Sequence, residues 1–287
     1  MGGLYALIAV GLNLQYGLMR VLNVAHGEFL MLGGYITYLL HVHLGVNPLV
    51  TVLVSGPAAF AGGVAVHALL FRRLLRQERT REELEASSLL LSFGLLFILQ
   101  NAALLLWSAD LRGYQYLDRP LRLLGAVYPA NRVVAFAGAA VVTAGLLIFL
   151  RGSLAGAAVR ALMQDPTAVR LMGVRVARIH AFCFGLGVAL AAVTGSLVSM
   201  LFELTPFIGL PYTVTALVVV ILGGLGSVAG SLVGGLILGV VESVGVHFTS
   251  PDLRMAITYG VLALVLVLRP YGLFNPMAHR PGQATQA

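Results

Sequence analysis

The chain has 287 residues, of which 59% are hydrophobic and only 10% are charged, whereas a typical soluble domain has about 25% charged residues. So little charge cannot cover a surface in water, which excludes an ordinary soluble protein and favours one embedded in lipid. The net charge of +7 comes from arginines, because the chain contains no lysine; a P-loop nucleotide site and a Schiff-base enzyme, which both need lysine, are therefore excluded.

Apolar stretches long enough to cross a hydrocarbon core of about 30 Å recur along the whole chain. They lie at 2–19, 27–45, 49–71, 87–107, 132–150, 180–201, 209–222, 229–247 and 255–268. Lipid permits only helices and closed barrels, and these runs lack the alternation of barrel strands. We therefore predict an all-α fold: a polytopic transmembrane helix bundle of about eight helices, with short or broken segments, in a single domain over 1–287. The first stretch lacks the basic leader and cleavage site of a signal peptide and is expected to remain a helix.

A polar segment separates the first two stretches and contains Asn23, His26, Gly27 and Glu28. A carboxylate at the bilayer centre costs at least about 2.5 kcal/mol, so such residues are functional candidates by default. The segment predicts a broken helix whose backbone and side chains line a substrate path. The alternative is a short interfacial loop with Glu28 in water. His26 is expected to pack or cap, and no second His or Cys lies at metal-ligand spacing.

Arginine-rich loops set the orientation, since cytoplasmic loops carry an excess of basic residues. The loops 72–86 and 151–179 are predicted to be cytoplasmic, together with the tail from Arg269. The loop 108–131 and the N-terminus are then external. The arginines lie in short interhelical loops, so no nucleic-acid partner is expected. The stretch 209–222 is short for a full crossing and is interpreted as a half-helix that turns back at the glycines around 223–226.

The loop 151–179 is more structured than a linker requires. Asp165 followed by Pro166 is typical of a helix start, with Asp as the N-cap and Pro in the first turn. We expect two short helices that meet at this point and present a docking surface to a cytoplasmic partner. The alternative is a solvated basic loop that lies on anionic lipid.

Late in the chain, small residues recur at a spacing of four, at Gly226, Gly230 and Gly234. This pattern predicts tight helix packing, and no strand precedes it as a dinucleotide-binding loop would require. Of the two acids nearby, Glu203 is expected to be solvated. Glu242 lies deeper and is either a proton or substrate site or a side chain that reaches water. No catalytic constellation is present, and Cys183 is the only cysteine, so an intrachain disulfide is impossible.

Three segments together resemble the permease subunits of ABC importers for branched-chain, or more broadly hydrophobic, amino acids. The first runs from Tyr5 through Gly17 to Asn23–Glu28, the second covers Gly156–Gly173, and the third runs from Gly223 through Gly235 to Glu242. The resemblance spans essentially the whole chain. It implies alternating access driven by ATP hydrolysis in a partner chain, so this chain is expected to be no enzyme and to bind no cofactor itself, with ATP and Mg²⁺ on the partner.

The resemblance also implies partners and positions. We expect two ABC ATPase subunits, a second, related permease subunit or a homodimer mate, a solute-binding protein, and the lipid of a bacterial inner membrane. The ATPase-coupling residues carried over are Gly156, Arg160, Ala161, Asp165 and Gly173. Relatives usually place Arg or Lys where this chain has Ala157. They also often have extra residues before the first signature, so we expect Met1 to be a late start.

Two other functions remain open at this stage. An ion-coupled secondary transporter would want several intramembrane acids, and only Glu28 and Glu242 are available. A permease for urea or short amides would share the same family features. A purely structural membrane protein would not need the structured loop at 151–179.

Overall fold

The computed structural model describes residues 1–287 except 78–79, 124–125, 270–271 and 275–287. Its elements in chain order are α1 (Gly2–Met19), α2 (His26–Leu44), α3 (Pro48–Val66), η1 (His67–Phe71), α4 (Arg72–Gln77), α5 (Arg81–Trp107), β1 (Pro120–Leu123), β2 (Ala126–Pro129), α6 (Ala130–Gly152), α7 (Leu154–Gln164), α8 (Pro166–Leu171), α9 (Val176–Val198), α10 (Gly209–Gly223), α11 (Val228–Phe248), η2 (Pro251–Leu253) and α12 (Arg254–Leu268).

Within the described residues, seven helical segments are long and apolar enough to cross a membrane. They are α1, the continuous rod Pro48–Leu75, α5, α6, α9, α11 and the segment Pro251–Leu268. The predicted polytopic helical bundle is therefore confirmed. The expectation of a purely helical chain misses one feature, an antiparallel hairpin in which β1 pairs with β2.

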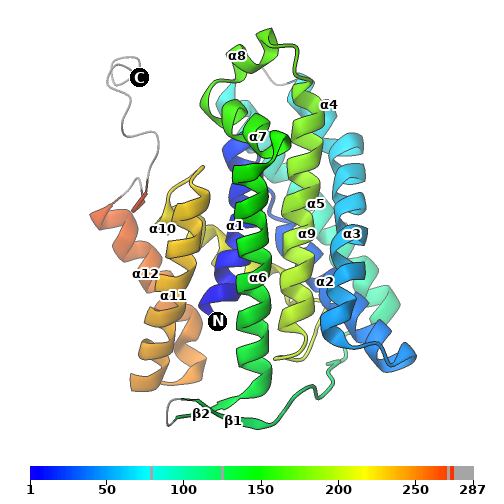
Figure 1. The fold of residues 1–287 in the computed structure, drawn as a ribbon, viewed down its shortest axis with the longest axis vertical. Helices are drawn as coiled ribbons and strands as arrows, with labels where there is room; N and C mark the ends of the chain where they lie inside the picture. The colour runs from blue at the N-terminus through cyan, green and yellow to red at the C-terminus, as the bar shows by residue number, and fades with distance from the viewer. Residues whose placement is uncertain (78–79, 124–125, 270–271, 275–287) are drawn as a thin grey trace.

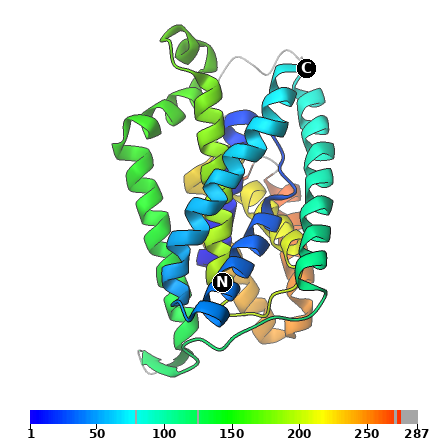
Figure 2. The ribbon, with the colours of Figure 1, turned by 90° about the vertical axis from the view of Figure 1, so that its right-hand side faces the viewer.

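The two ends of the bundle differ in composition (Figures 1 and 2). The amphipathic helix α7, the short α8 and the basic helix α4 lie at one end, and the β1–β2 hairpin lies at the other. The arginine-rich segments 72–86 and 151–179 therefore share one end, as the charge pattern predicts, and 108–131 lies at the opposite end. Following the orientation predicted from the arginines, we call these the cytoplasmic and external ends. The described parts of the predicted loop 72–86 are mostly helical, however: a π-helical turn carries α3 into α4, and a capping box at Thr80 and Glu83 starts α5.

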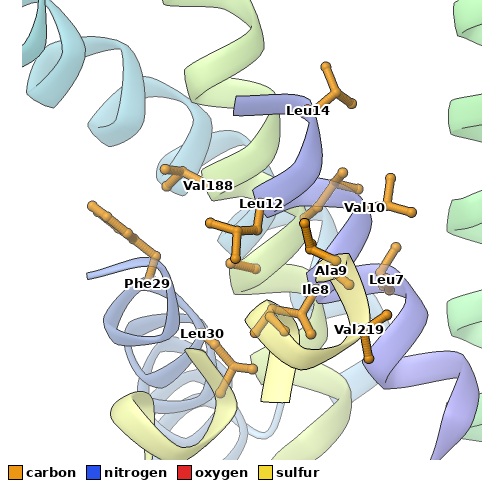
Figure 3. Close-up of a cluster of buried hydrophobic side chains, with 14 of the residues drawn as sticks. Leu7, Ile8, Ala9, Val10, Leu12, Leu14, Phe29, Leu30, Val188 and Val219 are labelled. Atoms are coloured by element: carbon orange, nitrogen blue, oxygen red, sulfur yellow. The ribbon is translucent and has the colours of Figure 1, made fainter. Parts of the chain in front are cut away.

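Helix α1 is the central element of the bundle. Fifteen of its residues are buried, and its apolar side chains point toward α2, α9 and α10 (Figure 3). The cluster includes Leu7, Ile8 and Leu12 from α1, Leu30 from α2 and Val188 from α9, none exposed by more than about 1%. A helix that is apolar all round and surrounded by other helices is the expected core of a membrane bundle. By contrast, only 6% of the span that contains α12 is buried.

Glycines bring α9 against its neighbours. A Cβ at Gly33 of α2 would collide with the Ala192 backbone of α9, and one at Gly195 would collide with the Leu30 carbonyl. Lipid supplies no hydrophobic drive for helix association, so close backbone contact of this kind stabilises the bundle through van der Waals packing.

The external segment before the hairpin is fastened to the helix ends. Arg112 and Leu204 exchange backbone hydrogen bonds of 3.0 and 2.7 Å, and the Tyr114 hydroxyl lies 2.9 Å from Ser199 Oγ. Burial raises the pKa of Tyr114 to about 12, although the Ser199 hydrogen bond acts in the opposite direction. Tyr114 therefore stays a neutral hydroxyl at physiological pH.

Candidate functional site

Two helices begin inside the bundle rather than at either end. Helix α2 starts beside the middle of α1, where His26 Nε2 lies 3.2 Å from the Ile8 carbonyl, and runs to the external end (Figure 2). Helix α10 starts beside α2 and runs to the cytoplasmic end. Its 15 residues span roughly 22 Å at 1.5 Å per residue, less than a full crossing, as expected for the predicted half-helix. The non-helical segments 20–25 and 199–208 lead into the two half-helices.

The two half-helices meet closely at their first turns, and we call this contact the half-helix junction. A Cβ at Gly27 would collide with the Gly209 carbonyl oxygen and with Thr213 Oγ1. The Gly27 N–H donates a hydrogen bond of 2.7 Å to Thr213 Oγ1, and the Thr213 hydroxyl donates one of 3.0 Å to the Val24 carbonyl. Thr213 thus satisfies backbone groups that the broken helix leaves without an intrahelical partner.

Glu28 lies at this junction and is completely buried. Neither carboxylate oxygen has a hydrogen-bond partner among the described residues, and the side chain packs against Gly209, the first residue of α10. The alternative of an interfacial loop with Glu28 in water is therefore wrong. The positive ends of two helix dipoles, those of α2 and α10, lie beside the carboxylate, and such ends stabilise negative charge.

Asn23 and His26 extend the junction toward α1 and α9. Asn23 donates a hydrogen bond of 3.1 Å to Gln15 Oε1, and Gln15 donates one of 3.1 Å to the Phe184 carbonyl. His26 is buried, with Nδ1 lacking a partner among the described residues. The four residues singled out from the sequence are thus brought to one buried place. Gln15 and Thr213 were missed, because polar residues inside apolar helices give no signal until their neighbours are known.

A second polar cluster lies in the external half of the bundle, between α1, α6, α11 and α12. The Tyr5 hydroxyl donates a hydrogen bond of 3.1 Å to Glu242 Oε1, and Arg254 Nε lies 2.6 Å from the same oxygen. Glu242 is 2% exposed, so of the two alternatives for this residue the one in which its side chain reaches water is wrong. Sequence reasoning found Glu242 alone. It missed Tyr5, which is 237 residues away in the chain, and Arg254.

Two cavities flank this cluster. The first, of about 230 Å³, is lined by residues of α1, α6, α11 and α12 together with Leu201, and the second, of about 170 Å³, by residues of α1, α10 and α12. Arg254 lines both. We call the cluster and its two cavities the external cleft. No group of three or more metal-ligating side chains occurs among the described residues.

The loop 151–179 forms two short helices that meet at Asp165, as expected. Asp165 ends α7, and its Oδ1 accepts a hydrogen bond of 3.1 Å from the Ala168 N–H in the first turn of α8. Gly156 is buried. It packs so closely on α6 that a Cβ there would collide with the Leu150 backbone. Arg160 and Ala161 are exposed, and Gly173 has a φ of +75°, which favours glycine.

Exposed apolar side chains accompany these positions. Leu154, Leu171 and Met172 are 92%, 86% and 81% exposed, although they lie on the short helices or turns at the cytoplasmic end rather than on a membrane-spanning helix. Large exposed apolar side chains at a polar end of a molecule are typical of a protein–protein contact.

The prediction for the late glycines needs one correction. Gly230 and Gly234 lie on α11 and pack against Gly223 of α10, but Gly226 precedes α11 and has a φ of +84°. It belongs to the turn between α10 and α11, where its N–H donates a hydrogen bond of 2.6 Å to Asn13 Oδ1. Gly226 has the same spacing of four as the two helical glycines, but it lies where the chain reverses direction between α10 and α11. A helix cannot make that reversal, so Gly226 is part of a turn.

Glu203 is exposed at the external end, as expected. It packs near Gly113 and takes no part in the junction or the cleft.

Comparisons with known proteins bear on these sites. The family described as "Branched-chain amino acid transport system / permease component" matches residues 1–266. The chain is 31% identical to the high-affinity branched-chain amino acid transport system permease protein BraD of Pseudomonas aeruginosa, over 96% of this chain and 92% of that protein. It is 30% identical to the corresponding permease protein LivH of Salmonella typhimurium, with the same coverage. A probable LivH of Methanocaldococcus jannaschii is 27% identical over 94% of this chain and 88% of that protein. No solved structure matches the chain at a significant level.

Proposed function

The chain belongs to the family of branched-chain amino acid transport permeases, and from that premise we propose that it carries branched-chain or other hydrophobic amino acids across the cell membrane. It is a multi-pass membrane protein and a transport subunit rather than an enzyme. The observation that carries the proposal is the extent of the family match, which includes both half-helices, the loop 151–179 and α11.

ATP hydrolysis belongs to a partner. ABC importers of this kind work with ATPase subunits and a solute-binding protein, and a chain without lysine cannot supply a P-loop of its own. We propose two ATPase subunits, which bind the ATP and Mg²⁺, and a second, related permease subunit beside this one.

The coupling contact is proposed for α7 and α8. The structured turn at Asp165, the exposed Arg160 and Ala161, and the exposed apolar side chains of Leu171 and Met172 support it. Because α7 packs on α6, α9 and α1, a push on these short helices would reach the central helix directly.

The substrate path is proposed for Asn23, His26, Gly27 and Glu28. The path needs a few polar groups in an apolar wall, since a free amino acid carries an ammonium and a carboxylate. The burial of these residues at the half-helix junction supports the proposal, because non-helical backbone at membrane depth is typical of a cavity or transport site. An ion-coupled secondary transporter is not favoured, given the family.

The test is uptake into proteoliposomes that contain this chain, its ATPases and the second permease. We expect leucine uptake that requires both ATP and the binding protein. Leu171→Glu should abolish ATPase co-purification and uptake, because it places a charge in the proposed contact. Leu111→Glu is the matched control, since Leu111 is 67% exposed at the external end. Uptake driven by an ion gradient without ATP, or unchanged uptake in Leu171→Glu, would contradict the proposal or its coupling part respectively.

A further inference from the structure

The external cleft contains more charge than an internal tether between helices needs. Glu242 and Arg254 form an ion pair through a single contact, Nε to Oε1. Tyr5 donates to the same carboxylate oxygen. An arginine that serves only to neutralise a buried carboxylate usually forms two parallel hydrogen bonds with it, which is the stronger arrangement. Here Arg254 and Tyr5 both contact Oε1 of Glu242. The second carboxylate oxygen takes part in neither contact.

The second carboxylate oxygen, Oε2, is buried and has no partner among the described residues. A buried carboxylate oxygen without a hydrogen bond is costly, so Oε2 retains unused capacity to accept one. An ionised carboxylate oxygen can accept hydrogen bonds but cannot donate one, so Oε2 suits an ammonium group.

Arg254 presents the complementary charge. Its side chain is 40% exposed, it lines both cavities, and the described residues accept no hydrogen bond from its terminal nitrogens. Arg132 of α6 also lines the first cavity. Guanidinium groups bind carboxylates in a planar, bidentate manner.

Apolar side chains line part of the first cavity, beside Ser243 and the N-terminal residue Met1. Leu4, Phe136, Leu201 and Val246 contribute to its wall. Its volume of about 230 Å³ lies below the range of roughly 300–1,000 Å³ for pockets that hold drug-sized ligands. The cavity therefore suits a small molecule that has both charges at one end and a hydrocarbon group at the other.

We propose that the external cleft is the entry site for the transported amino acid, with its α-ammonium on Glu242 Oε2, its α-carboxylate on Arg254 and Arg132, and its aliphatic side chain against Leu4, Phe136 and Val246. This inference rests on the proposed function. It assigns the first recognition of the free amino acid to α6, α11 and α12 rather than to the half-helix junction.

The cleft also adjoins the proposed path. Pro211, Tyr212 and Thr215, on one side of the first turns of α10, line the second cavity. Gly209 and Thr213, on the other side of the same turns, contact Glu28 and Gly27. The start of one half-helix thus forms the wall between the entry site and the junction, and a movement of α10 would open one to the other.

Cysteine protection tests the site directly. Cys183 is buried, so Ser243→Cys, which places a thiol on the wall of the first cavity, supplies an accessible thiol for a charged methanethiosulfonate reagent in the assembled transporter. L-leucine at about ten times its apparent Kd should slow the modification about 10-fold, because only the unoccupied fraction of sites reacts. The carboxylate 4-methylpentanoate and the amine 3-methylbutylamine, which each carry one of the two charges, should leave the rate near its unprotected value. Equal protection by all three compounds, or none by leucine, would overturn the proposal.

Uptake separates recognition from structure. Glu242→Gln should lower ATP-driven leucine uptake about 10- to 100-fold and remove the protection, whereas Asp252→Asn, an exposed acid outside both cavities, should change neither. The double exchange Glu242→Arg with Arg254→Glu restores a charge pair and should restore the level of protein in the membrane but not uptake. Restored uptake would reduce the pair to a structural tether and overturn the proposal. If the unaltered transporter takes up no amino acid, the proposed function itself fails, and this outcome is distinct from normal uptake in Glu242→Gln.

Discussion

Glu28 and Glu242 are both buried glutamates in a membrane bundle, but their surroundings differ in the partners offered to the carboxylate. Glu242 has a cation and a hydroxyl beside it, whereas Glu28 has no hydrogen-bond partner among the described residues and lies between the starts of two helices. The half-helix junction is built from glycine and backbone, and the external cleft from charged side chains. An ion pair suits recognition of a charged ligand, whereas the junction holds two helix starts together by close backbone contact.

The largest expected effect is in the packing of the junction. Gly27→Ala should destabilise the protein by about 3 kcal/mol or prevent assembly, because the new methyl group meets backbone that cannot move aside. Gly94→Ala in α5 is the matched control: no atom lies within 4 Å of its Cβ position, so it should be neutral or stabilise by up to about 1 kcal/mol. The apparent melting temperature in detergent, followed by size-exclusion chromatography, measures both. Equal effects of the two substitutions would show that the junction is not tightly packed.

The next effect compares the two carboxylates. Glu242→Gln should lower the free energy of unfolding by about 2 kcal/mol, since it removes the charge that Arg254 and Tyr5 contact. Glu28→Gln should leave the free energy of unfolding unchanged or raise it, because no hydrogen bond is lost and the desolvation cost of a buried charge exceeds the stabilisation from the two helix dipoles. The same melting assay distinguishes them, and a larger loss for Glu28→Gln would reverse the comparison.

Uptake tests the junction separately from stability. If Glu28 and His26 lie on the substrate path, Glu28→Gln and His26→Ala should lower transport while the protein remains folded. Unchanged uptake in both variants would remove these residues from the path.

The smallest effect concerns the Tyr5 hydroxyl. In the same melting assay, Tyr5→Phe should lower the free energy of unfolding by about 1 kcal/mol, the usual contribution of one hydrogen bond. Glu242 then loses one hydrogen-bond donor but keeps its contact with Arg254. Tyr259→Phe, whose side chain lines the second cavity and is 46% exposed, should have no measurable effect. A loss above that of Glu242→Gln would mean that Tyr5, and not the ion pair, holds the cleft together.

Local patterns in the sequence were sufficient for the outline of the molecule. Apolar length predicted the spans, and the arginine distribution predicted that 72–86 and 151–179 share one end. The Asp165–Pro166 pair predicted the break between α7 and α8. Each of these depends on residues close together in the chain, so the information lies in any short window of sequence. The helices at 72–77 and from residue 81 onward were missed, because high charge alone does not distinguish a loop from an amphipathic helix.

The sequence by itself determined that this chain is a helical membrane protein with arginine-rich segments at one end and two polar interruptions worth testing. Only the tertiary structure decided which groups meet: Tyr5 with Glu242, Asn13 with the turn at Gly226, and Gly27 with Gly209. These partners are separated by 180 or more positions, and a contact between distant segments has no period or spacing that one sequence can display. The physical reason is that helix formation depends on neighbours in the chain, whereas the pairing of buried charges depends on how the helices pack.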